Sequence, residues 1–186
     1  MSVMEQEDAV ATLLGGLADR TAWSARGHCS IERALEVVGT RSALLVLREA
    51  YYGTRRFDDF AQRVGISEAV AALRLRELVN AGLLERRPYQ EPGKRTRDEY
   101  VLTTMGRDLL PAVLAFMQWG DRYLAGPSGG PLLLAHTGCG APVGVAVRCG
   151  AGHDVALHEV GITPSPSVVP SSPVRPGDEA TGPTRE

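Results

Sequence analysis

Two histidines and two cysteines toward the C-terminal end of the chain form pairs whose spacing suits metal coordination. They are His136, Cys139, Cys149 and His153. The valines between the pairs alternate with other residues, which predicts a strand that joins two turns. Thiolates and imidazoles carried on turns at the ends of a hairpin can surround a zinc ion tetrahedrally. The sequence therefore offers structural zinc as a candidate cofactor, and a Gly-rich β-appendage with two reduced thiols is the alternative.

Enzymatic chemistry has little support in the sequence. There is no Gly-rich phosphate-binding loop and no His-Glu-x-x-His pattern. A zinc ion held by four protein ligands would also lack the open position that a catalytic zinc needs. We therefore expect this protein not to be an enzyme.

A second group of chemically active residues is basic. The stretch 40–107 has thirteen Lys or Arg and nine Asp or Glu, whereas the rest of the chain has seven and thirteen. The net charge of −2 therefore averages a basic segment with acidic flanks. Lys94, Arg95 and Arg97 stand at a Pro-Gly turn, with Arg86 and Arg87 before it. Positive charges on a flexible loop suit DNA phosphates, and a solvated charged hairpin is the alternative.

Apolar periodicity and helix caps indicate the elements that position these groups. Helices are predicted over about 5–17, 30–38, 40–52, 57–64, 67–80 and 104–124. Two extended runs, 83–89 and 100–102, flank a polar turn and predict a hairpin. Pro111 lies within the last helix and should be near its first turns or mark a kink.

This order of elements predicts a mainly α fold with a small β-hairpin, a winged helix-turn-helix, followed by a small β-rich C-terminal appendage. Helices 57–64 and 67–80, with a tight turn at Gly65, form the helix-turn-helix. A helix that enters the major groove needs small or polar side chains on its outer surface. The first half of helix 67–80 supplies Ser67, Glu68, Ala69, Ala71 and Ala72.

Short motifs occur in a specific order along the chain. They are CSIERAL at 29–35, GTR at 39–41, RF-x-x-F at 56–60, IS at 66–67, RLREL at 74–78, AGLLER at 81–86, YVLT at 100–103, G-x-x-LLPAVL at 106–114 and WG at 119–120. Each motif is short, but their ordered combination resembles the HxlR-type transcriptional regulators. The resemblance extends over roughly residues 28–124.

The resemblance implies a homodimer in which the N-terminal helix and the long C-terminal helix pack across a two-fold axis. Two recognition helices would then bind a pseudo-palindromic operator with half-sites about one helical turn apart. It also implies regulation by a small-molecule effector or by redox conditions, usually as repression. Some relatives sense oxidants through a cysteine at the position of Cys29, which makes Cys29 a candidate redox sensor. A sensor thiol needs exposure and a favourable electrostatic environment, to which His28 and the following helix N-terminus could contribute, and a half-buried inert thiol is the alternative.

The residues expected to contact DNA lie on the recognition helix, on the wing and at two helix starts. They are Arg41, Arg56, Ser67, Glu68, Ala69, Ala72, Arg74, Lys94, Arg95 and Arg97. Arg74 is expected to reach a guanine or a phosphate, and Arg41 and Arg56 to contact phosphates. For Arg76, pairing with a residue one helical turn away in solvent is at least as good an interpretation as a contact with DNA.

Four positions depart from the pattern of the HxlR-type regulators. Ser42 stands where the family usually has Trp, Ala69 where it often has a basic residue, and Ala71 where it often has Leu. Leu73 occupies a position that is usually polar. The loss of donors on the recognition helix predicts more reliance on phosphate contacts, the wing and DNA shape.

The expected domains are residues 1–27, an N-terminal helix and loop acting as a dimerisation arm; 28–125, the winged domain with its C-terminal dimerisation helix; 126–162, the Cys/His appendage; and 163–186, a disordered Pro- and Ser-rich tail. The absence of a long apolar run, of a basic leader and of clustered cysteines favours the cytoplasm. The expected partners are double-stranded DNA, a second copy and a small-molecule effector. The competing function is a winged module for protein contacts or metal sensing that binds no specific DNA.

Overall fold

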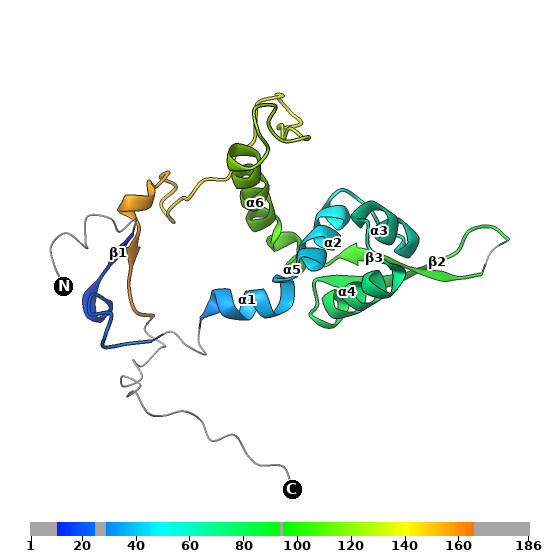
Figure 1. The fold of residues 1–186 in the computed structure, drawn as a ribbon, viewed down its shortest axis with the longest axis horizontal. Coiled ribbons are helices and arrows are strands. Elements are labelled where there is room, and N and C mark those ends of the chain that lie inside the picture. Colours follow the sequence, from blue (N-terminus) through cyan, green and yellow to red (C-terminus); the bar gives the residue numbers. More distant parts are fainter. Residues whose placement is uncertain (1–10, 25–28, 94, 166–186) are drawn as a thin grey trace, which may run out of the picture. The chain divides into compact units, whose positions relative to one another are not determined.

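The computed structural model describes residues 11–24, 29–93 and 95–165. Within these residues the chain forms two compact units (Figure 1). The winged unit is residues 30–145, and the second unit combines the described residues before 30 with those after 145. The expected boundary at 125/126 differs from this division, because residues 126–145 belong to the winged unit and residues 146–165 to the second unit.

The winged unit contains the predicted helices and hairpin in the predicted order. They are α1 (Ser30–Val38), α2 (Arg41–Tyr51), α3 (Phe57–Val64), α4 (Glu68–Asn80), β2 (Leu84–Tyr89), β3 (Arg97–Leu102), α5 (Thr104–Asp108) and α6 (Leu110–Tyr123). Strands β2 and β3 are antiparallel, with a register that runs from Leu84 opposite Leu102 to Tyr89 opposite Arg97. The mainly α fold with a small hairpin is therefore confirmed, and Figure 1 shows the hairpin extending beyond α3 and α4.

Local signals in the sequence set the ends of the helices. The Thr40 and Ser67 hydroxyls accept hydrogen bonds from the Ala43 and Val70 amides at 3.2 and 3.3 Å, which caps α2 and α4. Gly65 ends α3 in the left-handed conformation, with φ of 69°, which allows the tight turn between the two helices of the helix-turn-helix.

The core lies where α2, α3 and α4 meet the hairpin. Its largest fully buried side chains are Val46, Leu47, Phe60, Leu75, Leu78 and Leu84. The ring of Phe60 meets that of Tyr100 on β3 edge to face, with centroids 6.2 Å apart. The Tyr51 hydroxyl donates to the Gly106 carbonyl at 2.7 Å, and burial raises the pKa of Tyr51 to about 12. The core therefore fixes α4 and the hairpin relative to each other.

The last predicted helix is divided into α5 and α6, which meet at Leu109. Pro111 lies in the first turn of α6, one of the two outcomes that the sequence left open, because the missing amide of proline is tolerated there. The Gln118 amide nitrogen donates to the Val143 carbonyl at 2.8 Å, and the Val145 amide donates to the Gln118 carbonyl oxygen at 2.9 Å. These bonds attach the segment after α6 to the helix.

The strand predicted between the Cys/His pairs is wrong. Residues 143–147 have no strand assignment, and the valines at 143, 145 and 147 are exposed. The only bridges nearby are single ones, Ala135 with Pro142 and Arg148 with Asp154. The physical reason is that Gln118 bonds to the backbone where a neighbouring strand would have to pair.

The second unit contains β1 (Thr12–Leu13), paired in parallel with β4 (Gly161–Ile162), and two 3-10 turns, η2 (Gly15–Leu17) and η3 (Leu157–Glu159). The helix predicted over about 5–17 is therefore wrong for residues 12–17, and its first half lies outside the described residues. Gly15 has φ of 60° and ends any helical course, while the neighbouring amides bond to the strand from the other end of the chain. Most of the predicted tail, residues 166–186, also lies outside the described residues. No helix in the described part of the chain is long and apolar enough to cross a membrane.

Candidate nucleic-acid interface

The recognition helix α4 has a buried face and an outward face. Ala71, Leu75 and Leu78 pack into the core. The outward face, in steps of three and four residues, is Ala69, Ala72, Leu73, Arg76 and Asn80. The predicted contacts Ala69 and Ala72 are thus exposed, as are Glu68 in the first turn and the cap Ser67. The small residues near the start of α4 let its backbone come close to a surface that the helix enters.

Arg74 does not lie on the outward face. Its Nε donates to the Ser42 hydroxyl on α2 at 2.9 Å, and its Nη1 forms an ion pair with the Glu77 carboxylate. The side chain is only 22% exposed. The structure thus places Arg74 against α2, and the prediction that it reaches a base or phosphate is not supported by this position. Ser42, the residue that departs from the pattern of the HxlR-type regulators, provides the hydroxyl that accepts this bond.

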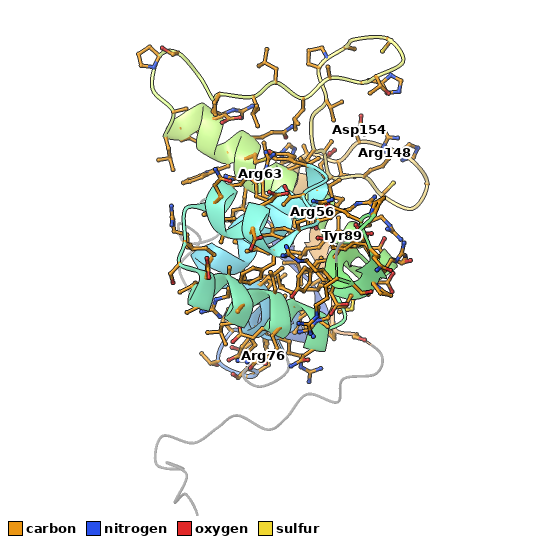
Figure 2. All side chains as sticks on the ribbon, turned by 90° about the vertical axis from the view of Figure 1, so that its right-hand side faces the viewer. Arg56, Arg63, Arg76, Tyr89, Arg148 and Asp154 are labelled. Carbon is orange, nitrogen blue, oxygen red and sulfur yellow. The ribbon has the colours of Figure 1, made fainter. Side chains whose placement is uncertain are left out.

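The sequence predicted that Arg74 faces outward and contacts DNA. In the structure Arg76 has that outward position instead. It is exposed at the centre of the outward face of α4, and within the described residues it has no ion-pair partner. Figure 2 shows Arg76 at the opposite side of the winged unit from Arg63 on α3. Helical periodicity alone places Arg76 on this face, because residues 69, 72, 73, 76 and 80 share one face and residue 74 does not. It does not show which arginine has a partner on another element.

The start of α2 offers a site for a phosphate. Arg41 is exposed and is the first residue of the helix after the cap Thr40. Amide groups at a helix N-terminus and an adjacent guanidinium both favour a negative charge. The predicted role of Arg41 is consistent with this position and stays a prediction.

The hairpin has the shape expected of a wing, with its basic residues near the turn. Arg95 and Arg97 are exposed, and Arg97 lies 4.0 Å from Asp58 on α3, a distance at which an exposed pair contributes little. Lys94 lies outside the described residues. Arg95 and Arg97 are thus available to a polyanion that passes the wing.

Arg56 connects α3 to the wing. Its guanidinium lies 2.6 Å from the Glu91 carboxylate and 5.0 Å from the centre of the Tyr89 ring. The hydrogen bond and charge of Glu91 raise the pKa of Arg56. Figure 2 places Arg56 close to Tyr89 and on the Arg63 side of the unit, away from Arg76. The predicted phosphate contact of Arg56 therefore has a competitor within the protein, which no local signal in the sequence could reveal.

Comparison with known proteins agrees with this geometry. An uncharacterized HTH-type transcriptional regulator of Mycobacterium tuberculosis is 44% identical over 138 residues, which are 74% of this chain and 86% of that protein. The regulator YdeP of Bacillus subtilis is 31% identical over 96 residues, 51% of this chain and 73% of that protein. The family model of the HxlR-like helix-turn-helix matches residues 37–127. This chain belongs to the HxlR-like helix-turn-helix family.

Solved structures show the same fold. Two candidate transcription factors, PA1607 and the Pseudomonas aeruginosa protein PA1374, are each 34% identical to this chain, with TM-scores of 0.62 and 0.55. They match 71% and 76% of this chain and 92% and 95% of their own chains. The resemblance inferred from the short motifs is thus confirmed, and with it the winged fold of a family of DNA-binding transcription regulators.

The cysteines and histidines form two separate pairs. His136 Nδ1 lies 3.1 Å from Cys139 Sγ in the winged unit, whereas Cys149 and His153 belong to the second unit, where the Cys149 amide donates to the His153 carbonyl at 3.0 Å. Bonds from the backbone amides of His153, Ala151 and Gly152 lower the pKa of Cys149. Each pair supplies two of the four ligands of a tetrahedral zinc, and the described residues contain no group of three or more metal-binding side chains. Zinc therefore stays a prediction.

Cys29, the predicted redox sensor, is half-buried immediately before α1. Its neighbour His28 lies outside the described residues. The position next to a helix N-terminus is as predicted, and the sensing role itself stays a prediction.

Proposed function

We propose that this HxlR-like chain is a repressor that binds a specific pseudo-palindromic operator as a homodimer and releases it in response to a small molecule or to redox conditions. The observation that carries the proposal is the outward face of α4, with small residues and an exposed Arg76, beside a wing that presents Arg95 and Arg97. Small residues let a helix enter the major groove, and flanking guanidinium groups bind the backbone. Its site of action would be the compartment that holds the chromosome.

Large exposed apolar residues on two helices support the dimer. Ile31 and Leu35 on α1 are 70% and 53% exposed, and Phe116, Trp119 and Tyr123 on α6 are 55–63% exposed. On each helix these residues are three, four or seven positions apart and so share one face. Clustered exposed apolar side chains of this size mark protein interfaces. A second copy would cover them, as the two-fold symmetry of a palindromic operator requires.

The DNA-binding part is tested by fluorescence anisotropy with duplexes from the intergenic DNA beside the gene and with a scrambled duplex. We expect preferential binding to one intergenic duplex, with affinity that decreases steeply as salt rises. Equal binding to all duplexes, or none, would contradict the proposal. It would favour the winged module for protein contacts, for which the apolar Ala69, Ala72 and Leu73 on α4 are the supporting observation.

The dimer is tested by sedimentation velocity of the Trp119→Ser variant. We expect the substituted protein to shift toward the monomer, because Trp119 is central to the exposed face of α6. Leu133→Ser is the matched control, since Leu133 is 96% exposed but lies outside both helices. A monomeric unsubstituted protein, or equal effects of the two substitutions, would refute the dimer as proposed.

A further inference from the structure

Two arginines on the recognition helix differ in their surroundings, and we propose that they have different tasks in DNA recognition. Arg76 reads a base edge in the major groove, whereas Arg74, through Ser42, is a positioning residue that fixes α4 against the start of α2. This inference rests on the proposed operator binding and assigns the residues that give it sequence preference.

The position of Arg76 suits a base-reading role. It lies on the same face as Ala69, Ala72 and Leu73, whose short or apolar side chains leave it as the long hydrogen-bond donor of that face. Its guanidinium is exposed and has no ion-pair partner within the described residues, so it gives up no internal bond when it binds. A guanidinium can donate two parallel hydrogen bonds to the O6 and N7 atoms of guanine. We infer that the operator half-site contains a guanine opposite Arg76.

The bonds of Arg74 suit a positioning role. Its Nε donates to the Ser42 hydroxyl at 2.9 Å, and the Glu77 carboxylate, one turn along α4, pairs with its positive charge. Only 22% of the side chain is exposed, so little of it is open to a phosphate. Turning it outward to DNA would break both bonds.

The link ends at the part of α2 that we expect to contact a phosphate. Ser42 follows Arg41, and the Ser42 hydroxyl lies 3.5 Å from that of the cap Thr40. Arg74 therefore connects α4, which we propose reads the bases, to the start of α2, which we expect to contact the DNA backbone. The bond sets how α4 is oriented when Arg41 is on its phosphate, so its loss should weaken base recognition without removing a phosphate contact.

The experiment uses a duplex selected by the full-length protein from a random pool, and compares it with a scrambled duplex by fluorescence anisotropy. We expect Arg76→Ala to lower the ratio of the two affinities by roughly tenfold or more. Arg63→Ala is the matched control, because Arg63 is an exposed arginine on the opposite side of the unit (Figure 2). It should leave the ratio unchanged.

The positioning role is tested by a double-mutant cycle with Ser42→Ala, Arg74→Ala and the double variant. Both single changes should lower the affinity for the selected duplex, and the double variant should bind no worse than Arg74→Ala, because both changes remove the same link. The salt dependence should not change, since no phosphate contact is lost. Circular dichroism and thermal unfolding identify a variant that fails to fold, in which case the milder Ser42→Ala decides.

Three results are decisive and distinguishable. If the unsubstituted protein selects no sequence, the proposed operator binding itself fails. If it selects one and Arg76→Ala keeps the same preference, the base-reading role of Arg76 is overturned. If Ser42→Ala binds like the unsubstituted protein while Arg74→Ala has a weaker salt dependence, Arg74 contacts a phosphate directly and the positioning role is overturned.

Discussion

The double substitution Arg95→Ala and Arg97→Ala removes two exposed arginines near the wing turn. It should weaken DNA binding and reduce the dependence of that binding on salt. Both side chains are exposed, and their loss leaves no buried group without a partner. The Asp58 carboxylate, 4.0 Å from Arg97, competes weakly because the pair is exposed to water. The substitution thus tests phosphate contacts and little else.

The expected magnitude follows from the number of charges. Each phosphate contact adds about 0.9 to the slope of log affinity against log salt concentration. Two arginines on each protomer of a dimer give a loss of slope of at most about 3.6. Over a fourfold increase in salt, this difference corresponds to a change of roughly 150-fold in the affinity of the unsubstituted protein relative to the variant.

The assay is a salt titration of duplex binding by fluorescence anisotropy, with the selected and the scrambled duplex. Binding to both should weaken together, because phosphate contacts carry no sequence information. Arg148→Ala, which removes an exposed arginine that pairs with Asp154 at 2.9 Å outside the winged unit, is the control (Figure 2). An unchanged slope in the wing variant, or an equal change in the control, would show that the hairpin is not a DNA-contacting wing.

Other predictions concern stability and thiol chemistry. Gly106→Ala should lower the free energy of urea unfolding by roughly 1–3 kcal/mol, because a Cβ there would collide with the Leu83 carbonyl and lie 3.0 Å from Leu102; an unchanged midpoint would contradict this packing. The pKa of about 12 for Tyr51 exceeds the unfolded value near 10, so its contribution to stability is complete below pH 10 and is lost as the pH rises to 12. Over this pH range the free energy of urea unfolding should decrease less in Tyr51→Phe than in the unsubstituted protein. Equal decreases in the two proteins would refute the raised pKa of Tyr51 as the cause. The lowered pKa of Cys149 predicts alkylation by iodoacetamide at lower pH in the folded than in the unfolded chain, and protection that a chelator removes would instead indicate bound zinc.

Local signals account for the elements of the winged unit. The caps Thr40 and Ser67, the left-handed Gly65 and the apolar periodicity each act over a few residues, so α2, α3 and α4 could be predicted without tertiary information. The prediction of an N-terminal helix was wrong because a long-range contact, and not a local signal, sets the structure there. Thr12 and Leu13 have apolar neighbours at helical spacing, but their backbone pairs with Gly161 and Ile162, far away in the sequence.

In the candidate interface, too, some features follow from the sequence and others depend on the tertiary structure. The basic wing and the small residues of α4 follow from residue types and their order, and so does the family. The roles of individual arginines do not, because a guanidinium that binds DNA and one that binds a neighbouring helix have the same sequence signature. The Arg56–Glu91 pair and the Arg74–Ser42 bond join positions more than thirty residues apart.

The sequence by itself determined that this chain is a winged helix-turn-helix of the HxlR-like family, because periodicity, caps and motif order are local properties of the chain. Only the tertiary structure decided which arginines are free to meet DNA. It tied Arg74 to α2 and Arg56 to the wing and left Arg76 exposed. The physical reason is that a charged side chain takes its role from the partner that the fold brings to it, and that partner lies on another element.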